Sequence, residues 1–254
     1  MILPSCAIDT EILENKSVSP GVYRLTVSAD EIARTAQPGQ FVQVLIERSF
    51  LLLRRPFGVA DINRDKGTLT MFYRLVGKGT HELSRLKAGE TVNCLGPLGH
   101  GFALDAQRPL LIGGGMGLAP LLLLARQFNG KATVLMGGKN QPEVFWAELF
   151  RPLCSEVLVT TDDGSVGVKG FPTEILPALL ERNGYDRLYV CGPQIMMEKV
   201  SEIAARFSVP CQVSLERHMA CGLGACLSCG IDAKGGQRKK VCKDGPVFWA
   251  EEVL

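Results

Sequence analysis

The sequence predicts a protein of three parts: an N-terminal antiparallel β-barrel, a central α/β domain on a parallel sheet, and a small C-terminal module rich in cysteine. Short β-branched segments between turn residues predict the barrel, and alternating strand and helix patterns predict the parallel sheet. Four closely spaced cysteines mark the module. In a chain of 254 residues, we expect the parts to span 1–102, 103–210 and 211–254.

The barrel is predicted from segments that alternate between apolar and polar residues or run apolar with β-branched residues. They are VYRLTVSAD (22–30), QFVQVLIE (40–47) and GTLTMFYRLV (67–76). Turn residues such as Ser19-Pro20-Gly21 and Gln37-Pro38-Gly39 separate them. Several short strands at this spacing are typical of an antiparallel barrel.

The α/β domain is predicted from a change of pattern after Pro109. Strand patterns occur at 108–113, 131–138, 155–164 and 186–193, and helix patterns at 119–128, 142–150, 173–184 and 196–207. Strands that alternate with helices in this way form parallel sheets covered by helices.

The composition limits the function classes. The net charge of +2 predicts no nucleic-acid partner. The longest uncharged apolar stretch, 109–125, is interrupted by glycine and proline and predicts no membrane span. The first residues do not resemble a signal peptide, so we expect a cytoplasmic protein. Nine cysteines in that setting favour metal or redox chemistry over a disulfide framework.

The C-terminal cysteines follow the pattern C-x4-C-x2-C-x12-C, at Cys221, Cys226, Cys229 and Cys242. A plant-type [2Fe–2S] site has C-x4-C-x2-C followed by a more distant fourth cysteine, and we expect a later strand to carry it. Zinc is the alternative, although structural zinc sites usually pair two C-x2-C knuckles or add two histidines. Cys211 lies outside the pattern and is interpreted as a buried thiol.

Two further segments have features of phosphate sites. Arg55 precedes a proline in an apolar setting, and Gly79-Thr80 opens a predicted short helix, where free N–H groups favour an anion. A surface arginine and an ordinary helix cap explain this segment equally well. Gly113, Gly114, Gly115 and Gly117 lie between a strand and a helix, where small residues admit a pyrophosphate or simply pack the helix.

The first segment resembles the flavin domain of the ferredoxin–NADP reductase superfamily. The residues that the resemblance assigns to flavin are Arg55, Pro56, Phe57 and Gly58, then Phe72, Tyr73 and Arg74, then Gly79 and Thr80. Gly58 departs from the family's usual serine, so the resemblance leaves the hydrogen bond near flavin N5 to the loop backbone.

The second segment resembles the nucleotide domain of the same superfamily. The resemblance places Gly114, Gly115, Gly117 and the Cys191-Gly192-Pro193 turn beside the nucleotide. Residues 161–163, Thr-Asp-Asp, end a strand and are a further candidate; Cys191 is otherwise a buried core thiol. NAD is favoured over NADP because the sequence shows no pair of arginines to bind a 2′-phosphate. Lys139 could bind that phosphate, so NADP remains the alternative.

Nearly the whole chain resembles the electron-transfer subunits of class 1B, NAD-dependent, dihydroorotate dehydrogenases. The most specific motifs are RRPF, YRLVGKGT, GGGMGLAPL, TTDDGSVGVKG, ERHMACGLGACLSC and VCKDGPVF. The resemblance implies FAD, a [2Fe–2S] cluster and NAD as substrate. It also implies an FMN-containing catalytic subunit as partner, in a heterotetramer of two plus two.

The implied function is electron transfer from the partner's FMN through [2Fe–2S] and FAD to NAD+, in pyrimidine biosynthesis. The dihydroorotate site is expected on the partner, so no catalytic residue for dihydroorotate is assigned here. The alternative is a related flavin and iron–sulfur subunit of a ferredoxin-, sulfide- or sulfite-linked complex.

Overall fold

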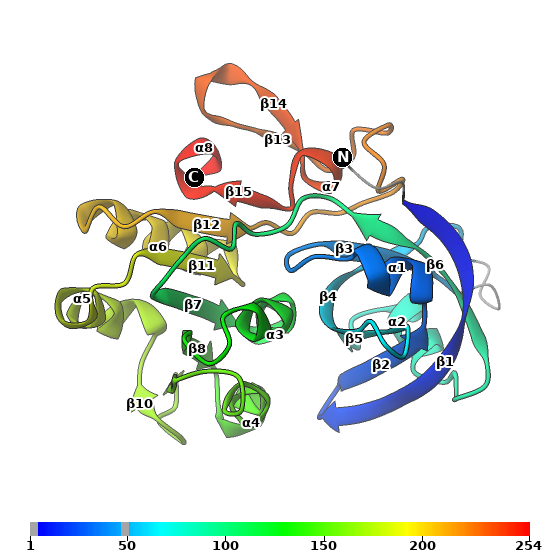
Figure 1. The fold of residues 1–254 in the computed structure, drawn as a ribbon, viewed down its shortest axis with the longest axis horizontal. Coiled ribbons are helices and arrows are strands. Elements are labelled where there is room, and N and C mark those ends of the chain that lie inside the picture. Colours follow the sequence, from blue (N-terminus) through cyan, green and yellow to red (C-terminus); the bar gives the residue numbers. More distant parts are fainter. Residues whose placement is uncertain (1–4, 47–50) are drawn as a thin grey trace.

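The computed structural model describes residues 5–46 and 51–254. A β-barrel and an α/β unit lie side by side, and a small hairpin near the C-terminus stands beside the end of the α/β sheet (Figure 1). The three predicted parts are therefore present in the predicted order.

The N-terminal unit is a closed antiparallel barrel with strand order β1-β2-β5-β4-β3-β6. The strands are β1 (Cys6–Ser19), β2 (Val22–Ser28), β3 (Phe41–Leu45), β4 (Arg55–Asn63), β5 (Thr68–Arg74) and β6 (Thr91–Leu98), with helices α1 (Asp30–Thr35) and α2 (Lys78–Leu83). Every second residue of β5, namely Leu69, Met71 and Tyr73, packs into the barrel interior. Glu47, the last residue of one predicted strand, lies outside the described residues.

The α/β unit has a seven-stranded sheet with order β10-β9-β8-β7-β11-β12-β15. Its strands are β7 (Pro109–Gly114), β8 (Thr133–Gly138), β9 (Glu156–Thr161), β10 (Val168–Lys169), β11 (Arg187–Cys191), β12 (Cys211–Ser214) and β15 (Val247–Trp249). All neighbours are parallel except β12 and β15. The central strand β7 is buried throughout, as expected for a parallel sheet covered on both faces.

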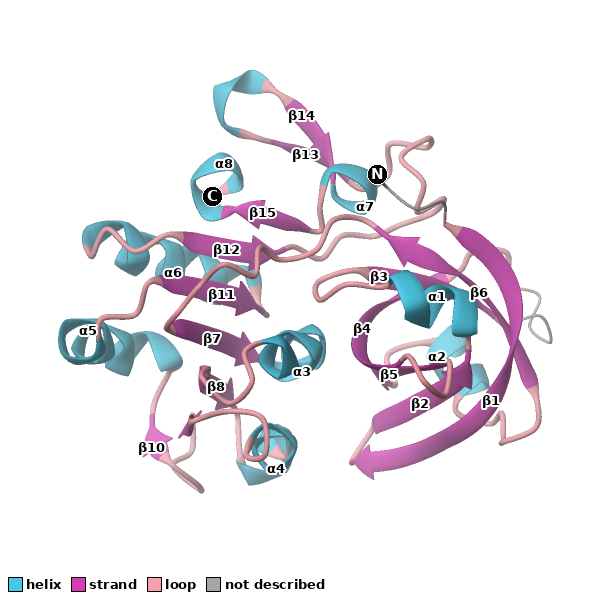
Figure 2. Ribbon diagram, in the orientation of Figure 1, coloured by secondary structure: helices cyan, strands magenta, loops and turns pink. Residues whose placement is uncertain are grey.

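Helices cover both faces of this sheet (Figure 2). One layer contains α5 (Pro172–Asn183) and α6 (Gln194–Arg206), and the other contains α3 (Leu118–Gln127) and α4 (Trp146–Phe150). The predicted helix at 142–150 is divided into a 3-10 turn, Gln141–Val144, and α4.

The sheet extends past residue 210, where the sequence analysis ended the α/β domain. β12 pairs in parallel with β11, and β15, close to the C-terminus, pairs with β12. Neither strand was predicted, because both are short and their partners are distant in the sequence. The other predicted limit, between 102 and 103, stays a prediction.

The cysteine module consists of the loop that follows β12, the hairpin of β13 (Gly230–Asp232) and β14 (Arg238–Lys240), and α7 (Val241–Asp244). Cys242 lies in α7, so the expectation that a strand carries the fourth cysteine is wrong. Two of the cysteines, Cys229 and Cys242, belong to the buried core of the α/β unit. The module is thus fixed to the sheet that carries it.

Side-chain contacts fix the barrel against the α/β unit. The ring of Phe72 in β5 packs on Trp146 in α4, with centroids 4.9 Å apart. Arg126 in α3 pairs with Asp61 in β4 at 2.8 Å. Among the described residues, no helix is long and apolar enough to cross a membrane.

Candidate functional site

A cavity of about 550 Å³ lies where the barrel, the α/β unit and the segment after β12 meet; we call it the barrel-side cavity. Seven of the nine residues assigned to flavin line it: Pro56, Phe57, Gly58, Phe72, Tyr73, Arg74 and Thr80. The opposite wall comes from the α/β unit and includes Met116, Pro120 and Cys191. The structure therefore brings the predicted flavin residues of three separate elements to one cavity.

The other two assigned residues, Arg55 and Gly79, meet beside that cavity. A Cβ atom on Gly79 would lie 2.5 Å from Arg55 Nε, so a side chain at 79 would displace the guanidinium. The guanidinium also donates to the carbonyl oxygen of Leu53. The neighbouring Arg54 has a different task, because it donates to the Asn93 carbonyl at 3.1 Å and ties two barrel strands together.

Gly79 and Thr80 were expected to open the helix, and they are instead the second and third residues of α2. The helix begins at Lys78, and the Thr80 hydroxyl accepts the Val76 N–H at 3.0 Å. The first N–H groups of a helix have no partner within it. In α2 these groups start beside Arg55, which makes a cationic cradle suited to a diphosphate.

The three assigned residues of β5 differ in what their side chains do. The Tyr73 hydroxyl donates to Asn15 Oδ1 at 2.8 Å, and burial raises the pKa of the phenol. Phe72 packs in the interface between the two units. Arg74 also reaches the α/β unit, where its guanidinium pairs with Glu143 at 3.4 Å.

Gly58 faces the start of α3. A Cβ atom on Gly58 would lie 3.4 Å from Pro120 Cβ, which is ordinary van der Waals contact. The structure therefore leaves room for a small side chain at this position, and the packing of α3 on β4 does not require glycine.

A second cavity, of about 600 Å³, lies over the turn between β7 and α3; we call it the glycine-turn cavity. Gly114, Gly115, Gly117, Gly192 and Pro193 all line it, as the sequence analysis expected. The structure requires glycine at two of these positions for different reasons. A Cβ atom on Gly117 would lie 2.4 Å from the carbonyl oxygen of Cys191, whereas Gly115 has positive φ and open space around it.

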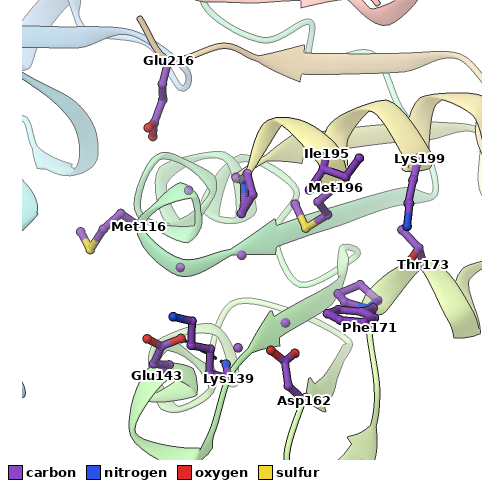
Figure 3. A pocket seen from close by; sticks show the side chains of 18 of the residues that line it. Met116, Lys139, Glu143, Asp162, Phe171, Thr173, Ile195, Met196, Lys199 and Glu216 are labelled. Atoms are coloured by element: carbon purple, nitrogen blue, oxygen red, sulfur yellow. Dashed lines mark hydrogen bonds between the residues drawn. The ribbon is translucent and has the colours of Figure 1, made fainter. Parts of the chain in front are cut away.

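The segment Thr161-Asp162-Asp163 contributes one residue to this cavity, Asp162. The Thr161 hydroxyl donates to the Val166 carbonyl, and an Asp163 carboxylate oxygen accepts the Ser165 N–H, so both hold the following turn. Figure 3 shows Asp162 between Lys139 and Phe171, with Ile195 and Met196 on the helix above them.

Cys191 is both a buried thiol and part of the barrel-side cavity. Its side chain is 2% exposed, and burial raises the pKa of the thiol. The thiol therefore stays protonated at neutral pH and presents an apolar, polarisable surface rather than a nucleophile.

The two cavities meet at Arg74, Met116 and Glu216, which line both. Glu216, which the sequence analysis did not assign, hangs from the segment after β12 into the glycine-turn cavity (Figure 3). The carboxylate is accessible through the cleft, yet the protein around it raises its pKa by desolvation. The position of Glu216 depends on how the barrel, the α/β unit and the segment after β12 pack together. No spacing of residues in the sequence indicates such packing.

The four cysteines of the module form two pairs. The Cys226 N–H donates to Cys221 Sγ at 3.4 Å, and the Cys242 N–H donates to Cys229 Sγ at the same distance. The Ser228 hydroxyl lowers the pKa of Cys226 to about 6, whereas burial raises that of Cys242 to about 12. Within residues 5–46 and 51–254, no three His, Cys, Asp or Glu side chains are close enough to hold a single metal ion.

Two glycines give the cysteine loop an unusual backbone conformation. Gly222 and Gly224 have φ of 69° and 81°, the left-handed region that favours glycine. The loop amides can therefore turn toward the thiols, as the contact from Leu223 N to Cys221 Sγ at 3.4 Å shows. Cys211 is a buried thiol in β12, as expected.

Comparison with known proteins agrees with this arrangement. Residues 216–254 match the family model of the iron–sulfur cluster binding domain of dihydroorotate dehydrogenase B. The electron transfer subunit of dihydroorotate dehydrogenase B (NAD(+)) from Desulforamulus reducens is 39% identical over 98% of this chain and 99% of its own length. The subunit of the same name from Caldanaerobacter subterraneus is 41% identical over 96% of both chains.

Solved structures share the fold. A structure of NADH-dependent reduced ferredoxin-NADP oxidoreductase has a TM-score of 0.85 and 34% identity, over 96% of this chain and 89% of that one. A ferredoxin NADP+ reductase from Neisseria gonorrhoeae with bound FAD and NADP has a TM-score of 0.62 at 19% identity, over 79% of this chain and 91% of that one.

A barrel joined to an α/β unit with two connected cavities, followed by a cysteine module, defines a ferredoxin reductase-like flavoprotein with an iron–sulfur domain. Identity over nearly the full length then narrows the class. The chain belongs to the family of electron transfer subunits of NAD(+)-dependent dihydroorotate dehydrogenase B.

Proposed function

We propose that the chain is the electron-transfer subunit of an NAD-dependent dihydroorotate dehydrogenase, connecting an FMN-containing catalytic subunit to NAD+ in pyrimidine biosynthesis. The observation that supports this best is the meeting of the two cavities at Arg74, Met116 and Glu216. A flavin ring in the barrel-side cavity and a nicotinamide in the glycine-turn cavity can come into contact there.

The residues of the barrel-side cavity suit FAD. Arg55, Gly79 and the first turn of α2 would hold its diphosphate, and Phe57, Gly58 and Pro120 would face its ring system. The glycine turn and Pro193 would hold the pyrophosphate of NAD, with Asp162 positioned for the adenosine side. When bound, NAD exchanges a hydride, a [2Fe–2S] cluster exchanges single electrons, and FAD exchanges both.

The cysteine module suits a [2Fe–2S] cluster because its thiols form two pairs, which matches two irons with two thiolates each. Leu223 and Leu227 of its loop are 51% and 59% exposed. We propose that the module faces the FMN-containing subunit in a two-plus-two heterotetramer. All nine cysteines are free thiols, which supports a reducing, cytoplasmic location.

A second candidate, a subunit of a ferredoxin-linked NAD(P)H oxidoreductase, is supported by the structure that is 34% identical. The higher identity of 39% and 41% to dihydroorotate dehydrogenase subunits favours the first. The two differ in their partner and electron donor, not in the site on this chain.

The test is to purify the chain with whatever subunits accompany it. We expect FAD, iron and acid-labile sulfide on this chain, an FMN-containing partner, and NAD+ reduction that depends on dihydroorotate. Reduction by ferredoxin and not by dihydroorotate would establish the second candidate instead.

A further inference from the structure

Gln43 in β3 is a buried glutamine with an unsatisfied amide. Its side chain is 0% exposed, and in the described part of the chain neither Nε2 nor Oε1 has a hydrogen-bond partner. Leaving such groups unpaired costs about 1–3 kcal/mol each, so a buried amide of this kind requires an explanation.

The amide lies against the cysteine loop. A Cβ atom on Gly222 would be 2.6 Å from Gln43 Cδ and 2.7 Å from Nε2, so any other residue at 222 would collide with the amide. Gly222 directly follows Cys221, whose Sγ already accepts two loop N–H groups at 3.4 Å, from Leu223 and Cys226. The loop therefore gathers N–H donors around this sulfur, and the unpaired amide of Gln43 lies against the same loop from outside.

β3 also connects the two sites. Phe41, two residues before Gln43 and on the same face of the strand, lines the barrel-side cavity. Gln43 is thus on the strand that runs from the flavin cavity to the cysteine loop. Its backbone is held by Arg54, which donates to the Gln43 carbonyl at 3.3 Å.

We propose that Gln43 is a positioning residue of the iron–sulfur site. Its Nε2–H donates a hydrogen bond to a sulfur atom of the cluster or its ligands beside Cys221. Hydrogen bonds to the sulfur atoms stabilise the added negative charge of the reduced cluster and raise its reduction potential. The inference rests on the proposed [2Fe–2S] site.

The test is Gln43→Met in the purified complex, because methionine has a similar length and no donor. We expect the equilibrium constant for one-electron reduction of the cluster to fall about tenfold, a potential about 59 mV lower, in an EPR-monitored titration. The control is Gln212→Met, which removes another buried amide, one that accepts the Ala103 N–H at 2.9 Å. It should lower stability and leave the potential unchanged.

A fully loaded Gln43→Met protein with the wild-type potential would overturn the role of Gln43. If the variant cannot be loaded, wild-type protein labelled with ¹⁵N at glutamine side-chain amides decides the question by pulsed EPR of the reduced cluster. A hyperfine coupling to the label supports the proposal, and no coupling overturns it. An absent cluster signal in the wild type would instead refute the iron–sulfur site itself.

Discussion

Glu216 shows how one residue gains a task from its surroundings. Glutamate is usually found at the surface, and this one precedes the cysteine loop, yet the fold places its carboxylate where the two cavities meet. The raised pKa records the cost of holding a carboxylate among protein atoms. A negative charge there would favour the positively charged nicotinamide of NAD+ over neutral NADH.

Glu216→Gln should therefore raise the dissociation constant of NAD+ about fivefold more than that of NADH. This factor corresponds to about 1 kcal/mol of binding free energy. Equilibrium dialysis measures the two dissociation constants, with NAD+ on the oxidised protein and NADH on protein whose flavin has been reduced beforehand. Glu202→Gln, on the exposed part of α6, is the matched control and should change neither. Equal weakening of both nucleotides would show that Glu216 senses no charge on the nicotinamide.

Glu216 also predicts how stability depends on pH. Because its folded-state pKa is raised, the folded chain binds more protons than the unfolded chain between the ordinary and the raised pKa. The contribution of Glu216 to stability is therefore fully present below the ordinary pKa and is lost as pH rises through the raised one. Glu216→Gln should flatten this fall and be no less stable than wild type at neutral pH. Urea unfolding of FAD-saturated protein across about pH 5 to 8 measures it.

At the same scale, the sequence predicted some site residues and missed others for clear reasons. The cysteine spacing and the glycine turns are local patterns, and the structure brings those residues together. Glu216 and Gln43 act through contacts with segments far away in the sequence. No local pattern distinguishes Gln43 from any polar residue in a strand.

At the scale of elements, the turn between β7 and α3 depends on close backbone packing. Gly117 lies against the backbone of Cys191 and Gly192, the turn that follows β11. The two turns therefore touch without any side chain between them, which fixes the floor of the glycine-turn cavity.

Gly117→Ala should push these turns apart, because a methyl group 2.4 Å from the Cys191 carbonyl oxygen cannot be accommodated without backbone movement. We expect a loss of about 1–3 kcal/mol in unfolding free energy and at least about tenfold weaker NAD binding. Thermal unfolding and nucleotide titration measure the two effects. Gly130→Ala, at an open turn after α3, should leave NAD binding unchanged. Normal NAD binding in Gly117→Ala would mean that the floor of the cavity is not formed by this contact.

Elements were predictable where the pattern is local. Apart from β10, the strands and helices from β7 to α6 lie where the apolar pattern of the sequence predicted them. β10, β12 and β15 were missed because each has two to four residues and is fixed by pairing with a distant strand. Cys242 was expected on a strand and lies in α7, since four residues give no usable periodicity.

For the whole molecule, the order of the parts sets the order of electron transfer. The cysteine loop packs on β3, the same strand lines the barrel-side cavity, and that cavity joins the glycine-turn cavity. In this series of contacts, the barrel-side cavity comes between the cysteine loop and the glycine-turn cavity. Loss of the cluster should then leave exchange between NADH and flavin intact while it interrupts transfer to the partner.

Cys226→Ser removes one of the four proposed ligands, the one whose thiol is most exposed. We expect the variant to lose iron and sulfide, to oxidise NADH with an artificial hydride acceptor within about twofold of wild type, and to reduce NAD+ from dihydroorotate about 100-fold more slowly in the complex. Cys6→Ser, on the barrel strand β1, is the matched control and should retain both activities. If Cys226→Ser lost iron and sulfide but kept full dihydroorotate coupling, the cluster would lie outside the electron path.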